Sequence, residues 1–324
     1  MEKKTPGVMT PAENARAVKE KALALGFSSC GIADLSPVSH EKEFNSWLEN
    51  GFAATMAYMQ RQKKKRLEPS RIVPGATSAI VLTRNYFVAD KETAPGSGKV
   101  AKYARREDYH DSLAKPLKEL VEFCCALGAE EAKTRSYVDA GPVPERELAQ
   151  RAGLGWIGKN TMLIDPKRGS FFFLASVLTD LSLEWDQPFQ FDRCGECRQC
   201  LDCCPTDAFV GPRVLDANAC ISYLTIEYRG AFDAAKNDKL NDWIFGCDIC
   251  QDVCPWNGKF AQPMDDELLG YRADLDWLDP EELMHISDEE FEIRFGSTPL
   301  ERPGPSGMRR NALALLAKEG NNGE

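Results

Sequence analysis

The first regular pattern along the chain is helical. Thr10 followed by Pro11 is typical of a helix start, and apolar residues recur at helical spacing from there to Gly26. A second helix is predicted over 112–128, where apolar side chains again share one face. Strands are predicted at 77–87, 134–141 and 170–180. This order of elements indicates an α/β or α+β domain up to about residue 185.

The hydrophobic pattern changes after that point. A connector leads into a cysteine-rich segment with few long periodic elements, as expected where metal replaces a large apolar core. From residue 263 the chain is acidic and mixed, and it ends in a loop and a short basic helix. We therefore divide the sequence at 1–185, 186–262 and 263–324.

Composition and charge restrict the cellular setting. The N-terminus has no apolar signal core and no twin arginine, and the apolar run at 171–178 is too short to cross a bilayer. We expect a cytoplasmic protein without a membrane anchor. The net charge of -10 disfavours indiscriminate nucleic-acid binding but leaves room for local basic patches.

Nine of the twelve cysteines lie between residues 194 and 254. Cys194, Cys197 and Cys200 are followed by Cys204 and a proline, the bacterial ferredoxin run whose fourth cysteine ligates the neighbouring cluster. A second motif, 247–255, lacks one leading cysteine, which Cys220 can supply. The prediction is two 4Fe-4S clusters, one held by Cys194, Cys197, Cys200 and Cys254, the other by Cys204, Cys220, Cys247 and Cys250.

The cysteine spacing also allows other interpretations. Paired C-x2-C motifs also bind structural zinc, but the triple spacing and the two following prolines favour clusters. Cys203 competes with Cys204 on spacing, yet only Cys204 precedes proline, so Cys203 is assigned to packing. Cys124 and Cys125 lie on the predicted helix 112–128, where core packing is expected.

The stretch "GLGWIGK" at 153–159 matches the start of a phosphate-binding loop. However, Asn160 stands where serine or threonine would hold magnesium, and no convincing strand precedes the loop. We expect its glycines instead to let the backbone pass close to a flat ligand.

Asp139 ends a predicted strand directly before an Ala-Gly-Pro turn, which would aim its carboxylate into a cavity. In apolar surroundings such a carboxyl group stays protonated near neutral pH and can donate a proton. The alternative is an ordinary aspartate that fixes the turn through a side-chain to backbone hydrogen bond.

Five blocks of the sequence, from about residue 15 to 312 in all, resemble the epoxyqueuosine reductase family in order, spacing and interleaving: "YVDAGPVPERELAQRAGLGWIGKNTMLI", "GSFFFLASVLTDL", "CGECRQCLDCCPTDAF", "CISYLTIE" and "GCDICQDVCPWN". The resemblance implies an oxidoreductase that reduces an epoxide on a modified tRNA anticodon base to an alkene, with cobalamin and two 4Fe-4S clusters. It also implies a relationship to reductive dehalogenases, which share the corrinoid and cluster plan.

The resemblance further implies roles for parts and residues. Residues 1–185 would form the cobalamin-binding catalytic domain, 186–262 a ferredoxin-like domain and 263–324 a helical segment packed on the core. Asp139 would be the proton donor and a cobalamin contact. Further cobalamin contacts would be Arg66, Ala101, Leu163, Leu174, Val177 and Ser222, although the apolar ones equally suit a plain core. Electrons would pass from cluster to cluster to cobalt.

The same resemblance implies partners. A tRNA anticodon stem-loop would be the substrate, an unidentified donor such as a flavodoxin or ferredoxin would supply electrons, and the enzyme would be a monomer. Basic runs at 61–66 and 102–106, with Arg309 and Arg310, are candidate phosphate contacts, the alternative being solvated surface. Some family members continue into a helical-repeat tail, whereas this chain stops at Glu324, so contacts from such a tail are absent or supplied otherwise.

Two competing functions stay open at the level of sequence. A reductive dehalogenase would act on a small organohalide, but the basic runs and the missing export signal disfavour it. A non-catalytic electron carrier would need neither an acid nor a corrinoid. His40, His110 and His285 form no ligand constellation and are assigned no role.

Overall fold

The N-terminal part is built on a four-stranded antiparallel sheet. The computed structural model describes residues 9–91, 96–233, 237, 239–263 and 267–321. The strand order is β1 (Ser29–Asp34), β2 (Ser78–Asn85), β7 (Phe172–Thr179) and β4 (Arg135–Val138). The three predicted strands are confirmed as β2, β4 and β7, whereas β1 was not predicted. Every neighbouring pair is antiparallel, so of the two predicted classes the α+β class is correct.

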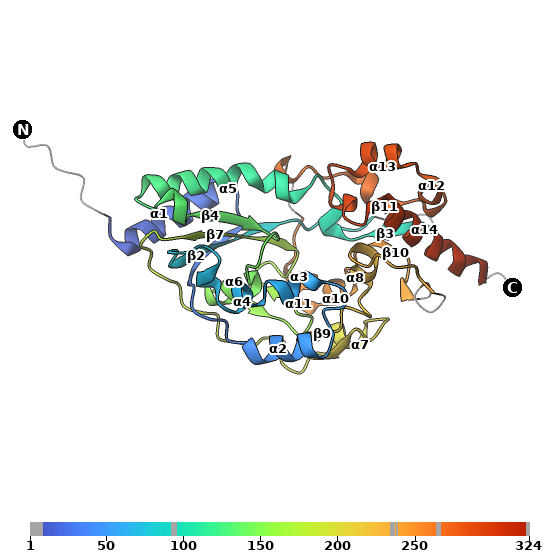
Figure 1. Ribbon diagram of the computed structural model, residues 1–324, viewed down its shortest axis with the longest axis horizontal. Helices are drawn as coiled ribbons and strands as arrows, with labels where there is room; N and C mark the ends of the chain where they lie inside the picture. The colour runs from blue at the N-terminus through green and yellow to red at the C-terminus, as the bar shows by residue number, and fades with distance from the viewer. Residues whose placement is uncertain (1–8, 92–95, 234–236, 238, 264–266, 322–324) are drawn as a thin grey trace, which may run out of the picture.

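Helices cover both faces of this sheet (Figure 1). The predicted helices are confirmed as α1 (Pro11–Ala24) and α5 (Tyr109–Ala126), and Thr10 and Glu13 form a capping box on α1. Their apolar sides pack with alternate residues of β7, among them Phe173 and Val177. The other residues of β7, including Leu174, pack with α6 (Glu145–Arg151) in a second cluster. Because both faces are buried, β7 is mostly apolar, with Ser176 and Thr179 as its polar residues.

A second sheet joins the three parts into which the sequence was divided. β3 (Gly98–Val100) pairs in parallel with β10 (Trp243–Phe245) and antiparallel with β11 (Trp277–Leu278). One strand thus comes from each part, and the buried residues around the sheet form a single cluster with α8 (Ile221–Ile226) and α14 (Gly304–Asn321). The division at 185 and 262 remains a prediction, and the second sheet is shared across it.

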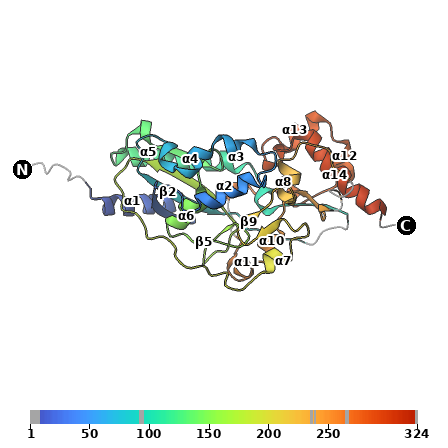
Figure 2. The same cartoon turned by 60° about the horizontal axis from the view of Figure 1, so that its bottom comes forward.

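The remaining elements are short. Between β1 and β2 lie α2 (Glu41–Glu49), α3 (Ala57–Arg61) and α4 (Lys63–Leu67). The cysteine-rich half and its approach contain hairpins β5–β6 (Trp156–Ile157, Leu163–Ile164) and β8–β9 (Phe209–Gly211, Val214–Leu215), with helices α7 (Gln199–Asp202), α8 (Ile221–Ile226), α10 (Ile249–Asp252) and α11 (Pro255–Phe260). Figure 2 shows α7, α10 and α11 gathered at one edge of the molecule.

The C-terminal segment consists of α12 (Pro280–His285), α13 (Asp288–Phe295) and α14 (Gly304–Asn321), which includes the predicted basic helix. Single 3-10 turns occur at Pro69–Arg71, Lys102–Ala104, Glu131–Lys133, Glu267–Leu269, Ala273–Leu275 and Pro299–Glu301. Within the described ranges, every helix falls short of the length and apolar character needed to cross a bilayer.

Candidate active site and cluster sites

The first predicted cysteine set surrounds a cavity of about 360 Å³. All four members line it, together with Trp256 and Phe260 of α11. Trp156 donates a hydrogen bond from Nε1 to the Cys194 sulfur at 3.4 Å, while Cys197 is exposed. The structure therefore brings together Cys194, Cys197, Cys200 and Cys254, as predicted, in an aromatic setting near the surface.

The second set has no exposed member, since Cys204, Cys220, Cys247 and Cys250 are all partly buried. Burial, followed by the charges of the neighbouring thiolates, raises the pKa of Cys200 to about 11 in the first set and also raises the pKa of Cys250 in the second. Burial raises the pKa of Cys247 as well, and the charges of Asp248, Cys220 and Cys204 add to the rise; the last two are the other predicted members of the second set. The charge of Cys200, a member of the first set, also raises the pKa of Cys250, so the two sets lie next to each other.

The donor chemistry fits clusters better than zinc. A zinc ion draws four ligands to about 2.3 Å from one point. Within the described ranges, no three His, Cys, Asp or Glu side chains converge enough to chelate a single ion. The first set opens around a cavity instead, and thiols that raise one another's pKa are stabilised as thiolates by a multivalent iron core.

Two cysteine assignments differ in outcome. Cys124 is fully buried in the cluster beneath α5, which confirms core packing. Cys203 was expected to pack but is exposed at the C-terminal end of α7, so that interpretation is wrong. Cys204 is partly buried and its charge reaches Cys220, so the structure brings Cys204 into the second set.

The glycine-rich stretch 153–159 serves the cluster sites. Lys159 donates from Nζ to the carbonyl oxygens of Gly195 (2.5 Å) and Cys197 (2.9 Å), and Asn160 donates to the Cys250 carbonyl. A Cβ on Gly155 would lie 2.1 Å from the Ile164 carbonyl oxygen. The expectation of a flat ligand against these glycines is therefore wrong, because the close neighbour at Gly155 is the protein's own backbone.

Asp139 lies just beyond β4 with a left-handed backbone, φ +46°. Its carboxylate accepts a hydrogen bond from the Tyr109 hydroxyl at 2.7 Å, and its backbone N–H donates to Glu145 Oε1 at 3.2 Å. Since Val138 pairs with Ala175, Asp139 stands at the level of Leu174. The hydrogen bond of the carboxylate thus runs to another side chain rather than to the turn, in favour of the proposed chemical role.

Tyr109 and Glu145 are the residues that sequence reasoning missed. Tyr109 stacks on Phe173 with ring centroids 4.2 Å apart, and burial followed by the Asp139 charge raises its pKa, so its hydroxyl remains a donor. Burial, with the Asp139 charge next, raises the pKa of Glu145 to about 8. At neutral pH this loop therefore holds a protonated carboxyl group beside Asp139.

This shift predicts how stability depends on pH. Folded Glu145 binds its proton up to about pH 8, whereas the unfolded group releases it near 4.5, so stability falls as pH rises through that window. Glu145→Gln should flatten this slope in thermal unfolding measured across the window. The control is Glu13→Gln on α1: hydrogen bonds from Thr10 lower the pKa of Glu13, so it is ionised across the window in both states and the slope should stay. An unchanged slope in Glu145→Gln would contradict the assignment.

The predicted cobalamin contacts do not share one surface. Arg66 and Ser222 are partly exposed, and so is Leu174. Ala101, Leu163 and Val177 are buried in three different apolar clusters. Val177 faces α1 and α5, opposite to Leu174 on the same strand.

The predicted basic runs differ in their exposure and in their partners. The expected phosphate contacts at 102–106 are wrong, because Lys102, Arg105 and Arg106 are 1–2% exposed and bind acids or carbonyl oxygens. Arg309 pairs with Asp288, and Arg310 donates to carbonyl oxygens of residues 224, 228 and 230. Both tie α14 to the core. In the described part of the chain, no ion pair is formed by Arg61, Lys63, Lys64 or Lys65. Their positive charges are therefore available to contact phosphates.

Two adjoining four-cysteine sites packed on an α+β domain define an oxidoreductase of the double-cluster iron–sulfur class. A family model described as "4Fe-4S double cluster binding domain" matches residues 193–257, and one described as "Epoxyqueuosine reductase QueG, DUF1730" matches residues 66–140. The epoxyqueuosine reductase of Cellulophaga algicola is 40% identical over 93% of this chain and 98% of its own length. The chain belongs to the epoxyqueuosine reductase family.

Further relatives agree. The epoxyqueuosine reductase of Pseudomonas aeruginosa is 41% identical over 94% of this chain and 86% of its own length. A solved epoxyqueuosine reductase in complex with an epoxyqueuosine-modified tRNA-Tyr stem loop is similar at TM-score 0.86 and 29% identity, covering 93% of this chain and 80% of that one. The Bacillus subtilis enzyme, solved with an aspartate-bearing catalytic loop swung out of its active site, is similar at TM-score 0.84 and 28% identity over the same shares.

Proposed function

We propose that this chain reduces the epoxide of epoxyqueuosine in a tRNA anticodon loop to the alkene of queuosine. The observation that carries the proposal is that Asp139 contacts both Tyr109 and Glu145, which makes a candidate acid site, in a chain that also holds two four-cysteine sites. The family membership and the neighbour solved with a modified tRNA stem loop support the substrate.

The reaction sets the requirements for the residues. Converting an epoxide to an alkene consumes two electrons and two protons and releases the oxygen as water, so an acid must meet the oxygen as its bond to carbon breaks. Asp139 gives the first proton. Glu145, which holds its proton below about pH 8 and lies next to Asp139, replaces the proton that Asp139 has given, so that Asp139 can deliver the second. The Tyr109 hydroxyl donates to the Asp139 carboxylate and holds it in place.

The residues near Asp139 fit a cobalamin. Arg66 Nη2 donates to the Gly141 carbonyl at 3.4 Å, while the buried Arg66 Nε has no partner within the described ranges, a donor that the acceptor groups of a corrinoid would satisfy. Cobalamin would be held by Arg66, Asp139, Leu174 and Ser222, the predicted contacts that keep exposed surface, whereas the buried Ala101, Leu163 and Val177 belong to three separate apolar clusters. When bound, it supplies a strongly reducing cobalt centre fed by the clusters.

The tRNA would be held by α3 and α4. Arg61 of α3 lines, with Tyr58, a cavity of about 430 Å³, and Lys63, Lys64 and Lys65 of α4 follow it along the chain. Lysines contact phosphates as point charges, and aromatic rings stack on bases splayed out of single-stranded loops. The negative net charge is thus compatible with a local tRNA site.

This placement predicts a salt effect. Lys64→Glu combined with Lys65→Glu should weaken binding of the modified stem loop and reduce the slope of log K against log salt by roughly one to two, since about 0.7 per contact is expected for single strands. Binding is measured by fluorescence anisotropy of a labelled stem loop. The control is Lys115→Glu with Lys118→Glu on α5, which lies across the sheet from α4 (Figure 1). Equal losses in both pairs would contradict a site on α4.

Electrons would enter at the first cluster, because Cys197 is exposed there while all four cysteines of the second set are partly buried. A flavodoxin or a ferredoxin suits this role as a small soluble electron carrier.

The direct test is conversion of epoxyqueuosine-containing tRNA by anaerobically reconstituted protein, followed by mass spectrometry of the nucleosides. Queuosine should form only when iron, cobalamin and a reductant are all supplied. Fully loaded protein that leaves the epoxide intact would overturn the proposal.

A further inference from the structure

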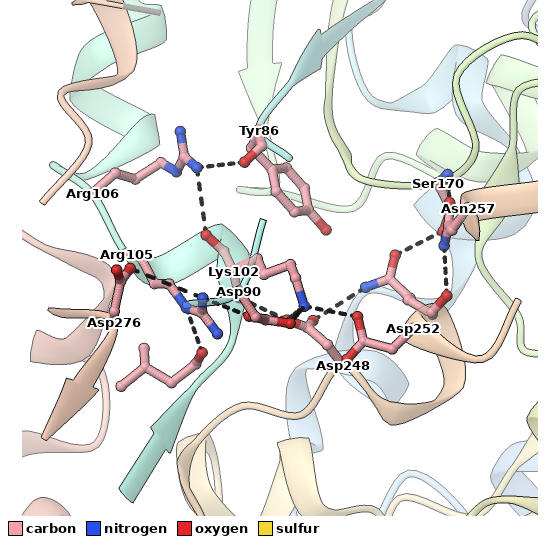
Figure 3. Close-up of polar contacts among 12 residues, drawn as sticks. Tyr86, Asp90, Lys102, Arg105, Arg106, Ser170, Asp248, Asp252, Asn257 and Asp276 are labelled. Atoms are coloured by element: carbon pink, nitrogen blue, oxygen red, sulfur yellow. Dashed lines mark hydrogen bonds and ion pairs between the residues drawn. The ribbon is translucent and has the colours of Figure 1, made fainter. Parts of the chain in front are cut away.

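Lys102 is a charged side chain that the proposed chemistry does not use, yet it is only 1% exposed. Figure 3 shows it among carboxylates from two distant parts of the chain. Its Nζ lies 2.7 Å from Asp90 Oδ2, 2.7 Å from Asp252 Oδ1 and 4.0 Å from Asp248 Oδ2. Its backbone N–H also donates to Asp248 at 2.7 Å. The ammonium group is therefore fixed in place and charged.

Two of these carboxylates flank a predicted cluster ligand. Asp248 is the N-cap of α10 and Asp252 is its last residue, and Cys250 lies midway between them. Cys254 follows two residues later as the N-cap of α11. Cys250 is assigned to the second cluster and Cys254 to the first, so the segment that presents two acids to Lys102 also carries one ligand of each cluster.

The other side of Lys102 is equally fixed. Ala101, its neighbour, donates to the Phe245 carbonyl at 2.9 Å, and a Cβ on Gly246 would lie 2.5 Å from the Ala101 side chain. Asp90 is held from its second oxygen by Arg105 at 2.8 Å. Hydrogen bonds, ion pairs and close packing thus join the segment 98–102 to the segment 242–252.

We propose that Lys102 is a positioning residue for electron transfer, whose buried positive charge raises the reduction potential of the second cluster while its carboxylate contacts hold α10 beside Ala101. Reduction adds negative charge to a cluster, so a fixed cation nearby favours the reduced state, and this attraction is strong where water is excluded. The proposal rests on the proposed clusters. A buried ion pair that served folding alone would leave the potential unchanged.

The first variant is Lys102→Met, which keeps the length of the side chain and removes its charge. The midpoint potentials of both clusters are measured by anaerobic titration followed by electron paramagnetic resonance. The reduction equilibrium of the second cluster should fall about tenfold, equal to about 59 mV for one electron, and that of the first cluster by less. The control is Lys99→Met on β3, whose lysine lies at the surface 4.0 Å from Asp242 and should leave both potentials unchanged.

A second variant should shift the potential of the second cluster in the opposite direction, and it tests the proposal even if Lys102→Met fails to fold. Asp90 is half exposed and its pKa is lowered, burial being outweighed by Lys102 and Arg105, so it is charged. Asp90→Asn should shift the second cluster to a higher potential. Loosened packing would move both variants in one direction, so shifts of equal sign, or no shift in Asp90→Asn, overturn the proposal. Protein that lacks iron instead refutes the clusters themselves.

Discussion

Asp139→Asn is expected to lower kcat for conversion of epoxyqueuosine tRNA roughly 100- to 10,000-fold, the range that general acids contribute. Asparagine keeps the shape of aspartate and can still accept the Tyr109 hydrogen bond, but it has no carboxyl proton to give to the leaving oxygen. Asparagine also tolerates the left-handed backbone that Asp139 adopts. The loss should therefore appear in turnover and not in folding.

The measurement is the amount of queuosine formed per enzyme, with iron, cobalamin and stem-loop affinity determined on the same preparation. Asp242→Asn provides the control, since Asp242 also has a positive φ but lies at the exposed start of β10. Turnover retained in Asp139→Asn would remove Asp139 from the mechanism. Turnover lost together with cobalamin would show that Asp139 binds the cofactor and would leave its acid role to Glu145.

The residues of the cluster sites could be predicted from the sequence more completely than the residues around Asp139. Ligand spacing is local, so the run from Cys194 to Cys204 with its following proline indicated a ligand exchange that the structure brings together. The partners of Asp139 depend on the tertiary fold. Tyr109 is 30 residues away at the start of α5, and its nearness follows from how α5 packs on the sheet. Glu145 is only six residues away, so a second acid in the same loop was a signal that could have been used.

The basic runs show the same limit. Lys102 and its neighbours look like surface in sequence because charged residues are rarely buried without partners. Their partners are Asp90, Asp248, Asp252 and Asp276, which the second sheet assembles from three parts of the chain. The strand β3 that organises this sheet has three residues, too few for a hydrophobic period to be read. The run at 61–66 does lie largely at the surface, and there composition was the better guide.

Cys204→Ser is expected to remove the second cluster and to leave about half of the iron, because Cys204 crosses from the first motif to the neighbouring site. Serine is nearly isosteric but holds iron poorly compared with a thiolate, so the loss should be confined to that cluster. Cys203→Ser is the matched control at the adjacent position, where the thiol is exposed and outside both sets. It should keep all of the iron.

Iron and acid-labile sulfide are quantified on anaerobically purified protein, and electron paramagnetic resonance identifies which cluster remains. Cys254→Ser should give the reciprocal result, loss of the first cluster with the second retained, since the exchange runs both ways between the two motifs. Iron lost in Cys203→Ser but not in Cys204→Ser would reverse the ligand assignment. Zinc in place of iron in the unaltered protein would refute the double-cluster interpretation, because four thiolates around one zinc ion cannot carry electrons.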